Sequence, residues 1–157
     1  MNRRSVLSIL ALASLTATLA SAADKPNFSG SWKLNTDKSD FGPVPPPEKM
    51  ARTITHADPS LKYSSVSVGP QGEQKTEASY TTDGKESVNK LGGAEIKGVA
   101  AWDGENLTIK YKREVQGMDI SFAENWTLSA DGKVLTIVNN LSTPQGDFAL
   151  KMVLDKQ

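Results

Sequence analysis

Cysteine is absent from this chain of 157 residues, and histidine occurs once, at His56. Without disulfides the fold must be stabilised by packing alone. Thiolates and imidazoles are the usual ligands of zinc, haem and iron–sulfur clusters, so we expect no metal site and no cofactor. Lysine plus arginine number 18, as do aspartate plus glutamate, so the chain also lacks the positive field that attracts nucleic acid.

Long apolar runs are scarce, and the one present is VLSILALASLTATLA near the amino end. It follows Arg3 and Arg4 and precedes the small residues at 21–23, which is the order typical of a cleavable export signal over residues 1–23. The run is shorter than the roughly 20 residues that span a bilayer. We therefore predict an exported protein, periplasmic or extracellular, with no integral membrane segment after signal removal. The paired arginines leave open the general or the twin-arginine route.

The remaining residues, 24–157, have the length of one domain. Removal of Arg3 and Arg4 leaves 16 basic and 18 acidic residues, a net charge of about −2. Charged side chains are scattered singly along the chain, as on a solvated sheet face. We predict a single domain that is a monomer.

Turn signals recur every ten to fifteen residues, and the segments between them alternate in polarity, as LTIKYKREV and DFALKMVLD do. Asp-Gly pairs supply the positive backbone angles of tight hairpins. About ten antiparallel strands are predicted, beginning near residues 27, 49, 61, 73, 85, 94, 105, 118, 133 and 147. An open sheet of this kind would expose two edges, so closure is favoured. The predicted fold class is all-β, a single antiparallel up-and-down β-barrel of about 8–10 strands.

The heptapeptide FSGSWKL, Phe28 to Leu34, carries glycine and tryptophan two residues apart, Gly30 and Trp32. It resembles the opening strand of the calycin superfamily, in which lipocalins and fatty-acid-binding proteins begin with a Gly-x-Trp element. Overall the chain is most similar to small exported bacterial lipocalin-like proteins of unassigned function. The resemblance implies a lipocalin-like barrel that binds a small hydrophobic molecule.

A proline-rich strap at 37–48 follows this first strand, with prolines at 43, 45, 46 and 47. Proline lacks the amide donor and fixes its backbone angle, so the strap cannot form the helical lid of fatty-acid-binding proteins. It is expected to be extended. Two roles stay open: a loop folded over the mouth of the barrel, as in lipocalins, or a stiff connector across the barrel end.

Tight hairpins at the Asp-Gly pairs predict strand registers. Asp103-Gly104 would place Trp102 opposite Glu105, and Asp131-Gly132 would place Trp126 opposite Ile137. Both tryptophans then lie toward the Asp-Gly end, which we predict to be the floor of the barrel, with the strap end as its mouth. The residues expected to build the floor are Gly30, Trp32, Trp102 and Trp126.

Several polar side chains share the inward phase, and burying such groups is costly unless they are paired or solvated. They are the candidate ligand-binding residues, namely Arg52, Tyr63, Tyr80, Ser87, Asn89, Tyr111, Arg113, Glu124 and Asn139. They favour a cavity with an apolar floor and an arginine-bearing upper part, suited to an amphipathic anion. The alternative is structural: Arg113 would pack against Trp32, as an arginine commonly does in calycin barrels. The last strand, LKMVL, lacks the Arg-x-Tyr element with which fatty-acid-binding proteins grip a carboxylate.

The sequence thus predicts a binding or carrier protein rather than an enzyme, with no catalytic residue assigned. His56 lies beside Asp58-Pro59, where a surface or rim imidazole is expected. Two alternatives remain: a filled barrel acting as an envelope structural or interaction module, and a cofactor-free isomerase or cyclase that uses a desolvated Glu124.

Overall fold

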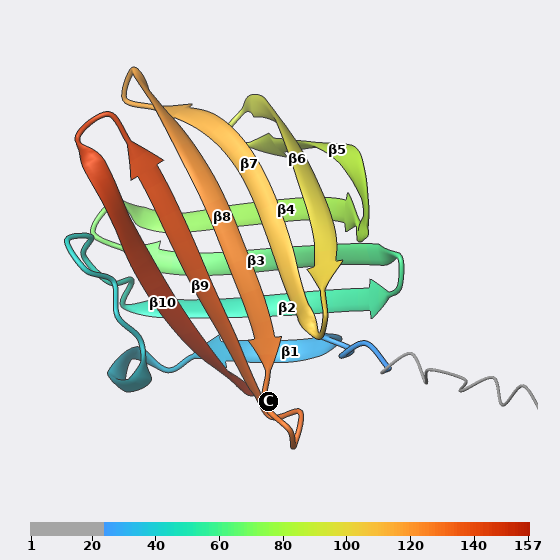
Figure 1. Cartoon of the computed structure of the whole chain (residues 1–157). Coiled ribbons are helices and arrows are strands. Elements are labelled where there is room, and N and C mark those ends of the chain that lie inside the picture. Colours follow the sequence, from blue (N-terminus) through green and yellow to red (C-terminus); the bar gives the residue numbers. More distant parts are fainter. Residues whose placement is uncertain (1–23) are drawn as a thin grey trace, which may run out of the picture.

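The computed structural model describes residues 24–157, so the predicted export signal at 1–23 lies outside the described residues. Ten strands follow one another, interrupted by one turn of 3-10 helix, Thr36–Lys38. Their bounds are β1 Gly30–Leu34, β2 Lys49–Ala57, β3 Ser60–Gly69, β4 Gly72–Thr81, β5 Asp83–Leu91, β6 Ala94–Asp103, β7 Asn106–Val115, β8 Met118–Leu128, β9 Val134–Thr143 and β10 Gly146–Lys156. The strands form one antiparallel sheet that curls into a nearly closed barrel (Figure 1). This confirms the predicted fold class.

Alternation along each strand decides which side chains enter the barrel. In β2, KMARTITHA, every second residue is buried: Met50, Arg52, Ile54 and His56. The intervening residues are exposed. Because side chains of a strand point alternately to the two faces, the polar Arg52 is carried inside by the same period that buries its apolar neighbours.

The sheet order is β4-β3-β2-β1-β10-β9-β8-β7-β6-β5, so β4 and β5 are its two edges. They lie beside each other without a backbone ladder, and side chains bridge them instead. The Ser79 amide donates to Asn89 Oδ1 at 2.7 Å, and the Thr81 amide donates to Ser87 Oγ at 3.2 Å. This seam, between residues 79–81 and 87–89, closes the barrel.

The hairpin registers agree with the sequence in one case and differ in the other. Trp126 lies opposite Ile137, as predicted. Trp102 lies opposite Leu107 rather than Glu105, because the turn is centred on Gly104 and Glu105 instead of Asp103 and Gly104. The shift moves the partner by two residues, which keeps its phase, so the inward set is unchanged.

The hydrophobic core gathers at the end of the barrel that carries the turns at 58–59, 104–105 and 129–133, which we call the floor. The opposite end, with the turns at 70–71, 92–93, 116–117 and 144–145, is the mouth. Fully buried side chains of the floor half include Phe28, Leu61, Leu107, Trp126, Leu135 and Leu154. Phe28 lies just before β1 and is 0% exposed, so the amino-terminal segment plugs the floor.

The strap at 37–48 follows the edge of β10 where β1 has ended. Asp40 and Lys151 exchange two backbone hydrogen bonds of 2.8 and 2.6 Å, and the Val153 amide donates to Ser39 Oγ. Phe41 packs on the core, whereas Val44 is exposed. The strap therefore completes the wall between β10 and β2, which β1 is too short to fill (Figure 1).

Candidate functional site

A buried carboxylate occupies the middle of the barrel. Glu124, on β8, is 5% exposed and accepts hydrogen bonds from Tyr111 Oη at 3.2 Å and Trp126 Nε1 at 2.9 Å. Asn139 on β9 lies opposite it in register, as predicted from the sequence. Two donors thus satisfy part of the acceptor capacity of Glu124, and no Lys, Arg or His of the described chain lies within 4.0 Å of it.

Arg52 faces this carboxylate region from β2. Its Nε donates to Ser65 Oγ at 2.7 Å, and its guanidinium carbon lies 4.5 Å from the ring centroid of Tyr63 and 5.3 Å from that of Trp126. A guanidinium stacked on aromatic faces keeps its charge and its orientation. Its Nη1 is buried and has no partner within the described residues.

The three tyrosines of the chain all surround this polar centre. Burial raises the pKa of Tyr63, Tyr80 and Tyr111, and the negative charge of Glu124 raises each of them further. All three phenols therefore stay protonated throughout the physiological range and can act as donors.

Arg113 lies nearer the mouth and is half-buried. Its guanidinium carbon is 5.5 Å from the centroid of Phe122, and its buried Nε has no partner among residues 24–157. The predicted alternative, in which Arg113 packs against Trp32, is wrong. Trp32 is covered by Lys156 of β10, whose Nζ lies 5.4 Å from the ring centroid.

The interior holds more polar atoms than the protein itself satisfies. In the described chain, five inward or seam side chains besides His56 keep a buried atom without a hydrogen bond: Arg52 Nη1, Tyr80 Oη, Asn89 Nδ2, Arg113 Nε and Asn139 Oδ1. Three of these atoms are N–H donors and one is an amide oxygen. Native proteins leave few such groups, so the set offers attachment points, chiefly donors, to a polar molecule in the barrel.

Apolar side chains in the same region remain partly accessible, in contrast to those at the floor. The inward, half-buried side chains are Tyr111, Phe122, Phe148, Leu150 and Met152. Leu150 shares a row of the sheet with Glu124, Tyr111, Phe122 and Phe148 lie one row nearer the mouth, and Met152 lies one row nearer the floor. The interior therefore combines an accessible apolar wall with unpaired donors.

The structure brings most predicted ligand-binding residues together, but Ser87 and Asn89 have another task. Arg52, Tyr63, Glu124 and their neighbours meet at mid-height, whereas Ser87 and Asn89 bridge the seam to β4. Of the predicted floor residues, Trp32 and Trp126 are fully buried and Trp102 is half-buried at the rim of the floor.

Sequence reasoning missed a cluster at the floor. The sequence places His56 at the surface, yet it is 5% exposed, and its Nδ1 accepts from the Phe28 amide at 3.3 Å. Its ring stacks on Phe28, with the centroids 5.5 Å apart. Desolvation lowers the pKa of His56, and the nearby Asp58 carboxylate opposes this. The prediction is wrong because the segment before β1 folds back over the Asp58-Pro59 turn.

Asp58 connects the elements of the floor. It accepts from Trp102 Nε1 at 2.8 Å and from the Thr82 hydroxyl, and it lies 3.5 Å from Lys25 Nζ and 3.8 Å from His56 Nε2. The hydrogen bond from Thr82 is the main reason that the pKa of Asp58 is lowered. An Asp-Pro turn is a weak sequence signal for such a cluster.

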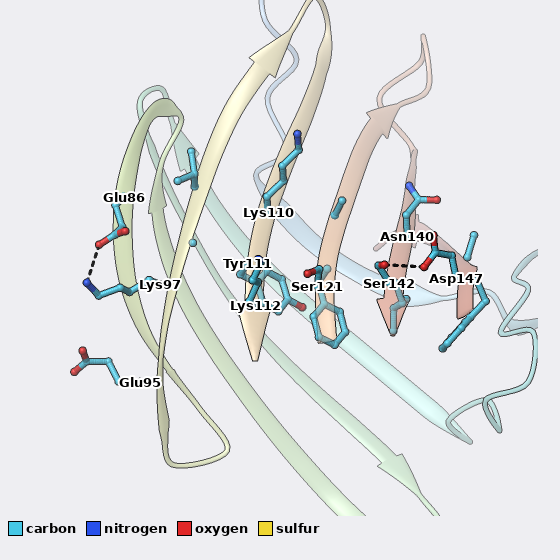
Figure 2. Close-up of a pocket in the computed structure, with 17 residues that line it drawn as sticks. Glu86, Glu95, Lys97, Lys110, Tyr111, Lys112, Ser121, Asn140, Ser142 and Asp147 are labelled. Carbon is cyan, nitrogen blue, oxygen red and sulfur yellow. Dashed lines mark hydrogen bonds and ion pairs between the residues drawn. The ribbon is translucent and has the colours of Figure 1, made fainter. Parts of the chain in front are cut away.

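A groove of about 980 Å³ lies on the outer face of β5 to β10, and Figure 2 shows its lining. Most of its lining residues have the outward phase of their strands, and none comes from β1 to β4, which places it outside the barrel. Its outward side chains include Lys97, Lys110, Lys112, Ser121 and Asp147. The polar interior centred on Glu124 is a separate site.

Within residues 24–157 no cluster of three or more His, Asp or Glu could hold a metal ion. In the same part of the chain, no helix has the length and hydropathy needed to cross a membrane.

No protein-family model matches the chain, and neither does any protein of curated function. Solved structures do share its fold. Zebrafish ileal bile acid-binding protein complexed with cholic acid is 19% identical, with 83% of this chain and 98% of that chain covered and a TM-score of 0.61. A secretory abundant heat soluble protein from Ramazzottius varieornatus is 17% identical, with coverages of 82% and 94% and a TM-score of 0.59. The REP1-NXSQ fatty acid transporter is 16% identical, with coverages of 82% and 97% and a TM-score of 0.53. At such identities the likeness shows the fold alone, a calycin-like barrel.

Proposed function

We propose that this chain is an exported binding protein that carries a small amphipathic anion inside its barrel. The observation that carries the proposal is the pair Arg52 and Arg113. Both guanidinium groups face the interior, each keeps a buried N–H without a partner among residues 24–157, and partly accessible apolar side chains lie beside them. A charged donor left unpaired in a buried site is costly, so an acceptor on a ligand would stabilise it.

The charges of the interior favour an anion over a cation. The interior holds two guanidinium groups, those of Arg52 and Arg113, and one carboxylate, that of Glu124, which already accepts from Tyr111 and Trp126. A ligand with one negative group would balance this arrangement, while its apolar part would contact Phe122, Leu150 and Met152.

The neighbours in fold support binding of this kind. One was solved in complex with cholic acid, and another is a fatty acid transporter. Such acids combine an apolar body with one carboxylate, which is the chemistry that the interior of this barrel would suit. A shared fold does not fix a shared function, so the argument for an anion depends on the two arginines.

Export is the second part of the proposal and depends on residues 1–23. When the full-length chain is expressed in a bacterial host, the protein should appear in the envelope fraction, and its intact mass should be that of residues 24–157. Retention in the cytoplasm at full length would contradict export without affecting the binding proposal.

Native mass spectrometry of the mature protein purified from its own envelope tests binding directly. We expect a recurrent mass excess that solvent extraction releases. The Arg113→Leu variant should show no mass excess, because leucine is apolar and the substitution removes the positive charge near the mouth. Lys62→Leu, which removes an exposed lysine on β3, is the matched control and should retain the excess.

The binding proposal also has a clear contrary result. An unliganded mass, together with no rise in melting temperature across a panel of fatty acids, bile acids and smaller organic anions, would exclude a carrier function. The barrel would then act through its outer surface.

A further inference from the structure

The outer face of β8 and β9 carries no charged side chain between Ser121 and Ser142. The outward residues there are Ser121, Ala123, Asn125, Thr127, Val134, Thr136, Val138, Asn140 and Ser142. By contrast, β6 and β7 on one side carry Lys97, Lys110 and Lys112 outward. On the other side, β10 carries Asp147 and Lys151 outward. Depletion of charge at the centre with charge at the rim distinguishes protein interfaces from ordinary surface.

This face is also hollowed. The groove of about 980 Å³ runs across it, and its base is made of small residues, among them Ser121, Ala123 and Ala149. The longer Lys110 and Lys112 stand on the β7 side, as Figure 2 shows. Ser121 and Ala123 are half-buried although they point outward, as expected for the base of a concave surface.

Two groups of opposite charge flank the groove in one row of the sheet. The register places Lys112 beside Ser121, Ser121 beside Ser142, and Ser142 beside Asp147. Ser142 Oγ donates to Asp147 Oδ1 at 2.7 Å. Within the described chain, neither Lys112 nor Asp147 has an oppositely charged side chain within 4.0 Å.

A two-fold axis parallel to the strands, between β8 and β9, would pair all four of these charged groups in a dimer. It superimposes the β7 side of one copy on the β10 side of the other within the same row, so Lys112 faces Asp147 of the second copy, twice. An axis across the strands would instead lay β7 of one copy over β7 of the other, so Lys112 would not meet Asp147 of β10. Aligned sheets pack face to face with their strands within about 30° of each other, which the first axis allows.

We infer that the outer face of β8 and β9 is an isologous interface between two copies of this chain, fixed by reciprocal Lys112–Asp147 ion pairs. The inference is independent of ligand binding in the barrel. It differs from the monomer expected from the sequence, since the charges on which that expectation depends surround a stretch of β8 and β9 whose outward side chains are all uncharged.

Charge reversal tests the interface. Sedimentation equilibrium of residues 24–157 should show a concentration-dependent dimer. Lys112→Glu and Asp147→Lys should each raise the dissociation constant at least tenfold, since each places like charges opposite one another. Lys62→Glu on the distant β3 face makes the same change in net charge as Lys112→Glu and should leave the dimer unchanged.

The decisive experiment mixes the two charge-reversal variants. In a heterodimer of Lys112→Glu with Asp147→Lys, both flanks regain opposite charges, so an equimolar mixture should dimerise at concentrations at which each variant alone is monomeric. A wild-type chain that stays monomeric at millimolar concentration would overturn the inference. Dimers that persist in both variants, or a mixture that fails to associate, would show that another surface is responsible.

Discussion

The ammonium nitrogen of Lys156 lies 5.4 Å from the ring centroid of Trp32, so the last strand of the barrel covers the tryptophan of the first. Gly30 makes this contact possible. A Cβ atom at Gly30 would lie 2.7 Å from Lys156 Cε, and the residue has a φ of +140°. The Trp32 indole is also held below, where its Nε1 donates to the Phe28 carbonyl at 2.9 Å. Through Gly30 and Trp32, β1 therefore contacts both the segment that precedes it and the last strand, β10.

Gly30→Ala should destabilise the protein by about 1–3 kcal/mol, because alanine is strained at this φ and must also displace Lys156. The free energy of unfolding from urea titrations measures the effect. Gly146→Ala is the matched control, since Gly146 has a φ of +129° and a Cβ atom there would meet nothing within 4 Å. The loss at Gly30 should exceed that at Gly146. Equal losses would mean that backbone strain alone explains the effect of Gly30→Ala and that the contact with Lys156 contributes nothing.

His56 should make stability fall as the solution is acidified below its ordinary pKa of 6.5. Its pKa is lowered in the folded state, so below pH 6.5 the unfolded chain binds the proton more readily than the folded one does. Protonation of Nδ1 would also break the hydrogen bond from the Phe28 amide. We expect the free energy of unfolding to decrease from pH 6.5 downward.

His56→Phe should remove this pH dependence, even though the variant loses the Phe28 hydrogen bond and is less stable at every pH. Asp58→Asn is the informative comparison. It removes the carboxylate that opposes the lowered pKa of His56, so the decrease should become larger. An unchanged slope in His56→Phe would assign the dependence to carboxylates instead.

The seam between β4 and β5 should be the most easily opened part of the barrel wall. Asn89→Ala removes the acceptor of the Ser79 amide, and we expect a loss of about 1 kcal/mol and roughly tenfold faster hydrogen exchange at that amide. Asn89→Asp keeps a side-chain oxygen in place and should exchange more slowly than Asn89→Ala. Uniformly faster exchange across all strands would indicate global destabilisation rather than a local seam.

Much of the fold could be predicted from local patterns. Turn residues and period-two alternation locate each of the ten strands to within a few residues, and the phase of Arg52, Glu124 and Asn139 toward the interior follows from the same alternation. This phase survives the wrong register at Trp102, because antiparallel registers that differ by two residues bury the same face.

The partners of the buried polar groups could not be predicted in this way. The contact with Trp32 considered for Arg113 is made by Lys156 instead, because strand phase gives the direction of a side chain but not its height. The burial of His56 is equally hidden, since nothing near it in sequence shows that Phe28 folds back over it.

By itself, then, the sequence determined the all-β class, the strands and which residues face inward, because these depend on interactions between near neighbours in the chain. Only the tertiary structure decided which strands meet at the unpaired seam, which buried donors keep no partner, and that Lys112 and Asp147 flank one groove. Such features depend on how the sheet curls and closes, which joins residues far apart in sequence.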